Sequence, residues 1–195
     1  MYVVVIERMQ RLVRLMSVVV ELYGYVESQQ IDAEYAVGKS YNYAKIIGNK
    51  AVGGIVGGAW NTGGQILTIR YCYNTGTIQC TGVVNGGILG GTYNAIVEES
   101  TDATKNIIRS CYSIGKNEST SPNQISNKYA TVSNSYYLTG RTNVSGYGTE
   151  KVEIKFKADK SDKASVYYLL EIGASGVWRI NSYNNKYVSL SWQKE

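Results

Sequence analysis

Acidic side chains that could act as catalytic or metal-binding groups come together at one place in the sequence. Glu98, Glu99 and Asp102 lie within the segment NAIVEESTDATKN, residues 94–106. Two carboxyl groups at a fixed separation can hydrolyse a glycosidic bond, and a group of carboxylate oxygens can bind a cation such as calcium. A charged surface loop explains the same residues without any chemistry. The segment is therefore a candidate metal or acid–base site, and a solvated loop is the simpler interpretation.

Other chemically active side chains are scarce. The chain contains no histidine, which excludes catalytic triads, general acid–base steps and metal sites that depend on an imidazole. The three cysteines, Cys72, Cys80 and Cys111, lack the CxxC spacing of a metal or redox site. Cys80 lies in an apolar stretch with no base to activate it. We therefore expect no catalytic residue, no cofactor and no enzymatic activity.

Charge and aromatic content indicate which partners to expect. The net charge is +5, but Lys and Arg are scattered from Arg8 to Lys194 without a basic stripe, so we expect no nucleic-acid binding. Eighteen tyrosines beside a single phenylalanine indicate rings that need one polar end, as on a binding face, although tyrosine also packs structurally on β-surfaces. Trp60, Tyr93 and Tyr147 are expected in turns or loops. They are candidate ligand-binding residues for a host or matrix glycan or protein.

The elements that position these residues repeat along the chain. VGGIVGG, residues 52–58, returns as NGGILGG at residues 85–91, and IRYCYNTGTI, residues 69–78, returns as IRSCYSIGKN at residues 108–117. The glycine-rich copies share Gly-Gly-x-x-Gly, and the other copies share Ile-Arg-x-Cys-Tyr-x-x-Gly. The repeated positions are Gly53, Gly54, Gly57, Cys72, Tyr73, Gly76, Gly86, Gly87, Gly90, Cys111, Tyr112 and Gly115.

Two weaker copies extend this pattern in both directions. Residues 32–40, DAEYAVGKS, keep a tyrosine and a glycine, which aligns Gly38 with Gly76 and Gly115 as one turn position. Residues 132–140, VSNSYYLTG, keep a Ser-Tyr pair in place of Cys-Tyr.

Repeats of this length predict a solenoid. A unit of two short strands and two turns cannot bury its own apolar face, so it must stack on copies of itself. Parallel stacking places equivalent residues of neighbouring coils about 4.8 Å apart. We therefore expect Cys72 beside Cys111, and Tyr73 beside Tyr112, in an all-β parallel β-helix. The repeated glycines are expected where the coil bends sharply or where backbones come close.

These repeats resemble the GLUG-motif repeats of bacterial cell-surface and adhesin-like proteins. The similarity covers roughly residues 23–192 and is carried by AVGGIVGG with IRYCYNTGTI, then by NGGILGG with IRSCYSIG. The tail VWRINSYNNKYVSLSW is similar to the ending that often closes such arrays, with Val188 where the family usually has proline. The resemblance implies a right-handed parallel β-helix displayed on a bacterial surface. It implies no catalytic residues.

Three regions are expected along the chain. Residues 1–22 do not join the repeats, and their polar residues have helical spacing, which predicts an atypical segment that could cap the stack as an amphipathic helix. Residues 23–145 form the repeat β-helix. Residues 146–195 form a C-terminal cap that folds over the last coil and protects it from edge-to-edge association.

The C-terminal cap has its own expected elements. Alternation of Val152, Ile154 and Phe156 with charged residues predicts a strand. The stretch DKASVYYLL predicts a short helix, capped by Ser161 or Asp162.

The expected role is adhesion or structural spacing by a non-catalytic module. Arg8, Arg11 and Arg14 interrupt the N-terminal apolar run, which is typical neither of a signal peptide nor of a membrane span, so we expect no membrane insertion. We expect a secreted or cell-surface location as part of a longer exported chain. Two alternatives stay open: a carbohydrate-active β-helix that binds or cleaves glycans with the acidic loop 94–106, and a self-associating stalk or filament subunit.

Overall fold

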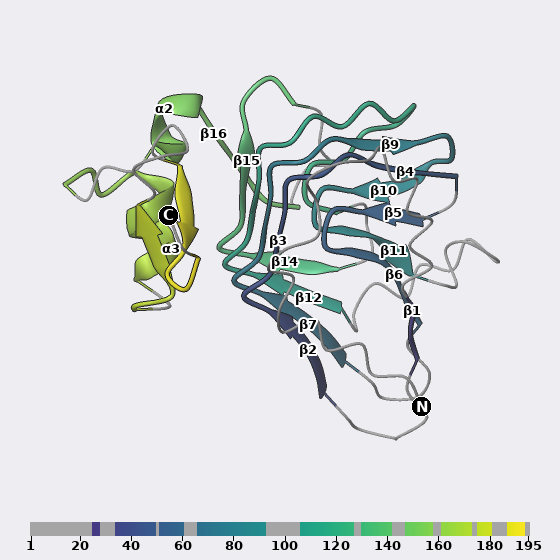
Figure 1. Ribbon diagram of the computed structural model, residues 1–195, viewed down its shortest axis with the longest axis horizontal. Coiled ribbons are helices and arrows are strands. Elements are labelled where there is room, and N and C mark those ends of the chain that lie inside the picture. The colour runs from purple at the N-terminus through teal and green to yellow at the C-terminus, as the bar shows by residue number, and fades with distance from the viewer. Residues whose placement is uncertain are drawn as a thin grey trace.

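The computed structural model describes ten segments of the chain, and the predicted capping helix of residues 1–22 lies outside them. The segments are residues 25–27, 34–49, 51–60, 66–92, 106–126, 130–141, 147–157, 161–172, 175–180 and 187–193. Two parts are visible in Figure 1, a stack of strands and a smaller unit of helices and a hairpin beside it. We call the second part, residues 152–193, the C-terminal lobe.

The strands of the stack follow one another in successive coils. Coil 1 contains β2 (Glu34–Gly38), β3 (Tyr41–Asn42), β4 (Ile46–Gly48), β5 (Ala51–Gly53) and β6 (Val56–Trp60). Coil 2 contains β7 (Ile66–Arg70), β8 (Tyr73–Asn74), β9 (Ile78–Cys80), β10 (Val84–Gly86) and β11 (Leu89–Thr92). Coil 3 contains β12 (Asn106–Arg109) and β13 (Tyr112–Ser113), and coil 4 contains β14 (Thr131–Ser133) and β15 (Tyr136–Leu138). Two further strands, β1 (Tyr25–Glu27) and β16 (Thr149–Lys151), add to the stack.

Equivalent strands of successive coils pair in parallel. One sheet has the order β14-β12-β7-β2 and another has the order β16-β15-β13-β8-β3. The remaining coil sheets are β1-β6-β11, β10-β5 and β4-β9. Every one of these pairings is parallel, which confirms the parallel β-helix that the repeats predict.

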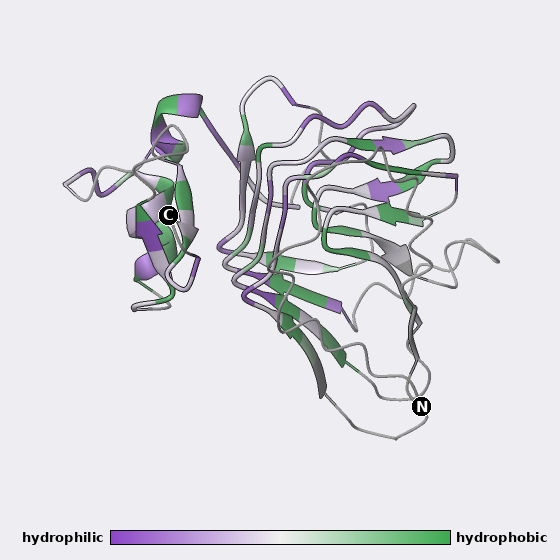
Figure 2. Cartoon of the chain, viewed as in Figure 1, coloured by the Kyte–Doolittle hydropathy of each residue, from purple (hydrophilic) through white to green (hydrophobic). Residues whose placement is uncertain are grey.

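Each coil turns from the first of these sheets into the second at one residue with a left-handed backbone. That residue is Lys39, Tyr71, Ser110 or Asn134, with φ between 43° and 57°. None of the four is glycine and only Asn134 is of a type that favours this region, so the coil path sets the conformation they share. Hydrophilic residues gather at this corner in Figure 2, while β7 and β12 are largely hydrophobic.

The pairing corrects the predicted alignment of coil 1. Gly38 pairs with Arg70 inside β2 and β7, and the partner of Tyr73 is Tyr41. Ala44 is therefore the equivalent of Gly76. A Cβ at Gly76 would lie 2.1 Å from the Ala44 carbonyl oxygen, so glycine is needed wherever the preceding coil is present. Among the described strands, none pairs with the outer side of β3, so Ala44 has room for its methyl group. This alanine conceals the equivalence of residues 41–44 with residues 73–76 in the sequence.

The repeated glycines lie where backbones of neighbouring coils come close. Gly53 pairs with Gly86, at the spacing that the sequence predicts. A Cβ on Gly54 would lie 2.2 Å from the Gly87 carbonyl oxygen, and a Cβ on Gly87 would lie 2.1 Å from the Gln124 carbonyl oxygen. Neither glycine needs a positive φ, so close approach is what selects glycine here.

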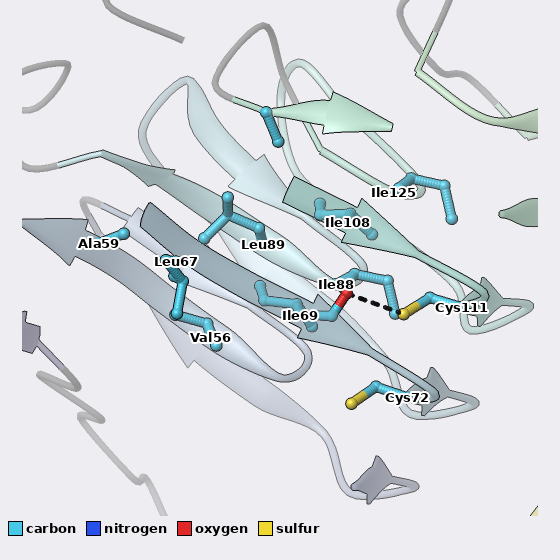
Figure 3. Packing of buried hydrophobic residues seen from close by; sticks show 11 residues of the cluster. Val56, Ala59, Leu67, Ile69, Cys72, Ile88, Leu89, Ile108, Cys111 and Ile125 are labelled. Atoms are coloured by element: carbon cyan, nitrogen blue, oxygen red, sulfur yellow. Dashed lines mark hydrogen bonds between the residues drawn. The ribbon is translucent and has the colours of Figure 1, made fainter. Parts of the chain in front are cut away.

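Apolar side chains fill the interior of the stack in columns. Figure 3 shows Ile69 and Ile108 on neighbouring strands, packed with Ile88 and Leu89 from another wall of the coil, and all four are fully buried. A smaller interior cluster contains Val52, Ile78 and Cys80. Each coil alone would leave such residues in water, so stacking supplies the hydrophobic stabilisation.

The C-terminal lobe differs from its sequence prediction in three ways. It contains α2 (Glu153–Phe156), α3 (Val166–Glu171) and an antiparallel pair, β17 (Trp178–Ile180) with β18 (Val188–Leu190). Residues 153–156 form a helical turn and not a strand, because only Phe156 is buried while Val152 and Ile154 are exposed. The cap of α3 is Ser165, whose hydroxyl accepts a hydrogen bond from the Tyr168 N–H at 3.2 Å, and not Ser161 or Asp162.

The third difference concerns where the lobe packs. It lies against the side of the stack, along the sheet of β3, β8, β13 and β15, and not over the last coil (Figure 1). The strand β16 pairs with β15, so the parallel stack itself continues to Lys151. The apolar residues of the lobe meet a row of rings on that side wall, and this contact fixes the lobe's position.

Candidate functional site

A ladder of tyrosines runs along the wall that the lobe covers. Each coil supplies one ring, from Tyr41, Tyr73, Tyr112 and Tyr136, and the pairing of strands places these residues next to one another. The rings of Tyr73 and Tyr112 stack with centroids 4.9 Å apart at 5°, and those of Tyr41 and Tyr73 stack at 5.4 Å and 15°. Cys72 and Cys111, one residue earlier, belong instead to the interior cluster of the stack.

The C-terminal lobe encloses the middle of the tyrosine ladder. Trp178 lies 6.4 Å from the Tyr73 ring and 6.0 Å from the Tyr112 ring, and Phe156 lies 5.9 Å from the Tyr112 ring. The Tyr112 hydroxyl donates a hydrogen bond to the Val188 carbonyl oxygen. Burial raises the pKa of Tyr73 and of Tyr112 well above the usual value, because a phenolate would lose its water there.

The ladder reaches solvent at its coil 1 end. Tyr43 stacks on Tyr41 with centroids 5.5 Å apart, and its side chain is 59% exposed. Trp192, at the end of the lobe, lies 5.8 Å from the Tyr41 ring and is 39% exposed. We call these three residues the aromatic end. At the other end Lys151 places its ammonium 5.8 Å from the centre of the Tyr136 ring, a cation–π contact.

An asparagine next to each of the first two ladder rings links the coils by a polar bridge. Asn74 is fully buried, and its Oδ1 accepts hydrogen bonds from the Gly76 N–H at 3.0 Å and from Asn42 Nδ2 at 2.9 Å. Asn42 Oδ1 accepts from the Ala44 N–H at 3.0 Å. Each asparagine therefore closes the turn that follows it, and the bond between the two joins coil 1 to coil 2.

The thiols have environments that suppress their chemistry. Cys72 and Cys111 are completely buried, and their Sγ atoms donate to the carbonyl oxygens of Arg70 and Arg109, two residues earlier. Burial, together with the neighbouring Cys72, raises the pKa of Cys111 well above its usual value. Burial also raises the pKa of Cys80. A nucleophilic cysteine needs the opposite shift.

Two of the described carboxylates, those of Glu118 and Asp162, are held in ion pairs with lysines at the surface. Glu118 lies 2.8 Å from Lys116, and this hydrogen bond lowers the pKa of the Glu118 carboxyl. Asp162 lies 2.6 Å from Lys155, whose hydrogen bond likewise lowers the pKa of Asp162. A general acid near neutral pH needs a raised carboxyl pKa, so neither group suits that role.

The sequence-predicted site residues are not brought together in the described part of the chain. Trp60 ends strand β6, not a loop, and its backbone pairs with Glu27. Tyr147 is half-buried in a bend before β16. The strand β16 belongs to a different sheet from β6, the strand that contains Trp60. Tyr93 and the acidic residues Glu98, Glu99 and Asp102 lie outside the described residues. Within the described segments, no group of three or more Cys, Asp or Glu side chains could hold a metal ion.

The aromatic end is the feature that the sequence prediction missed. Its signal is the dipeptide Tyr41-Asn42, which repeats Tyr73-Asn74 of the next coil. The alignment through Tyr35 and Gly38 concealed that match. The contact of Trp192 with Tyr41 joins residues far apart in sequence, and no local pattern indicates it.

Comparison with known proteins bears on the fold alone. No protein-family model and no curated protein sequence matches the chain. A solved structure named "putative immunoglobulin A1 protease" from Bacteroides ovatus is similar, with 18% sequence identity and a TM-score of 0.53. The alignment covers 88% of this chain and 62% of that one, so the chain spans about three fifths of its length. At this identity the likeness supports the β-rich architecture and nothing about activity. Among the described helices, none is long and apolar enough to cross a membrane.

Proposed function

We propose that this chain is a non-catalytic repeat module of a secreted or surface-displayed bacterial protein, acting in adhesion or as a structural spacer. The observation that carries the proposal is the enclosed tyrosine ladder. Tyr41, Tyr73 and Tyr112 join three coils to one another, and the C-terminal lobe contacts all three rings. A stack tied together along its side resists bending between coils, which suits a module that holds a binding surface at a distance.

The use of the reactive side chains also supports a non-catalytic role. The described thiols are buried with their hydrogen bonds directed to backbone carbonyls, and Glu118 and Asp162 are paired with lysines. A catalytic site usually contains a titratable group shifted toward neutral pH and placed in a cleft. Resemblance to the GLUG-motif repeats of adhesin-like proteins favours the same interpretation.

An enzymatic role is the second candidate, favoured by the name of the similar structure. A protease would need a nucleophile or a metal, and a carbohydrate-active enzyme would need opposed carboxylates such as those of the loop 94–106. Either activity is open to direct assay. We expect no cleavage of immunoglobulin A1 or of polysaccharides by the purified chain, and released products would contradict the non-catalytic proposal.

Adhesion and spacing are separated by a binding screen. The purified chain is applied to arrays of glycans and of matrix proteins, together with the variants Trp60→Ala and Tyr93→Ala. Selective binding to any ligand supports adhesion, and loss of binding in a variant assigns the ligand to the substituted residue. No binding on either array leaves spacing as the role, which then predicts a rod of constant length in small-angle X-ray scattering.

A further inference from the structure

Exposed rings from two separate parts of the chain meet at the aromatic end. Tyr43 follows β3 in the stack, and Trp192 follows β18 in the lobe, yet both contact Tyr41. The inner ladder rings are enclosed, with Tyr73 7% and Tyr112 1% exposed, whereas Tyr43 and Trp192 are open to solvent. The surface therefore exists only when the lobe is docked on the stack.

The rings of the aromatic end are held in place before any ligand arrives. Tyr41 is backed by Tyr73, whose hydroxyl donates to Gln193 Oε1 at 2.8 Å. Gln193 follows Trp192 and is tied to Leu190 twice, through its own N–H to the Leu190 carbonyl and through Oε1 to the Leu190 N–H. Rigid aromatic side chains lose little entropy on binding, so a fixed surface of this kind is suited to a ligand.

Two backbone donors beside the rings have no partner among the described residues. In coil 2, the N–H groups of Tyr73 and Thr75 donate to carbonyl oxygens of coil 1. The equivalent N–H groups of coil 1 belong to Tyr41 and Tyr43. Strand β3 is an edge of its sheet, and among the described residues no strand pairs with its outer side. These two donors are therefore directed away from the stack.

Asn42 supplies an acceptor beside the donors. The equivalent oxygen, Asn74 Oδ1, accepts two hydrogen bonds, one from Gly76 and one from the preceding coil. Asn42 Oδ1 accepts only from Ala44 among the described residues. Aromatic faces bordered by a few fixed donors and acceptors are typical of small-molecule sites.

The position of Tyr43 distinguishes between two kinds of ligand. The Tyr41 ring already stacks with both Tyr73 and Tyr43, so the ladder residue of a further β-strand added to β3 would have to compete with Tyr43 for contact with Tyr41. A sugar ring needs no such contact, because the apolar C–H face of a pyranose can lie against an exposed aromatic ring while its hydroxyl groups donate and accept hydrogen bonds. Building on the proposed adhesive function, we propose that the aromatic end is a carbohydrate-binding site, with the sugar on Tyr43 and Trp192 and its hydroxyls at the edge of β3.

The test uses the full chain with a panel of neutral and acidic oligosaccharides, matrix proteins and extended peptides, and titration calorimetry on any that bind. Tyr43→Thr removes the ring and introduces the residue that coil 2 has at the same position, Thr75. Trp192→Ala removes the second ring, and Tyr43→Phe keeps the first one. Val83→Ser, at a side chain 62% exposed between β9 and β10, is the matched control for loss of surface apolar area. Thermal unfolding of each variant checks that the fold is retained.

The expected result is binding of an oligosaccharide that weakens by about tenfold or more in Tyr43→Thr and in Trp192→Ala, and is unchanged in Tyr43→Phe and Val83→Ser. If an oligosaccharide binds equally well to Tyr43→Thr and Trp192→Ala, the proposed site is wrong, while the adhesive function is retained. A chain that binds matrix protein or extended peptide but no oligosaccharide also overturns it and leaves adhesion in place. If nothing binds at all, the carbohydrate site and the adhesive function are both wrong, and only spacing remains.

Discussion

At the scale of single residues, the distance between neighbouring coils decides which side chains are allowed. Gly54 and Gly38 are a matched pair, because a Cβ on Gly54 would lie 2.2 Å from a backbone oxygen, whereas a Cβ on Gly38 would lie 3.4 Å from one, an ordinary contact. We expect Gly54→Ala to lower the free energy of unfolding by about 2 to 3 kcal/mol, since the coils must separate to admit the methyl group. Gly38→Ala is expected to change it by less than about 0.5 kcal/mol. Denaturant unfolding measures both, and equal losses would contradict crowding as the cause.

Residue types in the repeats could be predicted from sequence wherever two complete copies exist. Cys72 with Cys111, Tyr73 with Tyr112, and the paired glycine runs all carry the same residue at the same place in each copy. The first half of coil 1 could not be aligned this way, because no described strand lies beyond β3 and Ala44 stands there in place of the glycine of coils 2 and 3. Tyr41 and Tyr43 escaped prediction for the same reason, since they belong to the part of the repeat in which the motif is weakest, and Trp192 lies far from them in the sequence.

At the scale of elements, the tyrosine ladder couples folding to alkaline pH. Burial raises the pKa of Tyr73 and Tyr112 in the folded chain, while the unfolded chain ionises near the ordinary value of about 10. Above that pH the unfolded state loses phenol protons that the folded state keeps. The stabilisation is therefore complete below about pH 10 and is lost as the pH rises beyond it.

The measurement is denaturant unfolding at a series of alkaline pH values, with the tyrosinate absorbance recorded in parallel. We expect part of the tyrosinate signal to appear only on unfolding. Tyr112→Phe keeps the ring and removes one titrating hydroxyl, so its loss of stability with rising pH should be smaller than in the parent chain. A native chain in which every tyrosine titrates at the ordinary pKa would contradict the enclosed ladder.

Elements of the C-terminal lobe show where sequence patterns mislead. Alternation at residues 152–156 predicts a strand, but the contact of this segment with the tyrosine ladder is made by one apolar side chain, Phe156. A single helical turn provides it. The sequence predicts the helix α3 but not its cap, which is Ser165. The helix begins there because Val166 and Leu170 form its buried apolar face. Tertiary contact with the ladder therefore overrides the local pattern.

At the scale of the whole molecule, the C-terminal lobe acts as a side cover for the stack. The sequence predicts that the lobe covers the last coil. In the structure it covers a wall of rings that spans the coils from Tyr41 to Tyr136. Removal of the lobe after Lys151 would keep β16 and every parallel pairing of the stack while exposing Tyr73 and Tyr112. A continuous row of exposed rings is an apolar patch of the kind that drives association.

We therefore expect a chain truncated after Lys151 to fold its strands and then to self-associate, as measured by circular dichroism and by size-exclusion chromatography with light scattering. A rescue variant distinguishes the wall of rings from the open edges of the sheets. Tyr73→Thr with Tyr112→Thr in the truncated chain replaces two rings by a polar residue that favours β-structure, and should restore the monomer if the ladder is the associating surface. If the rescue variant still associates, the edges are responsible. If the truncated chain is monomeric without rescue, the lobe does not protect the stack, and its part in forming the aromatic end becomes the better reason for its position.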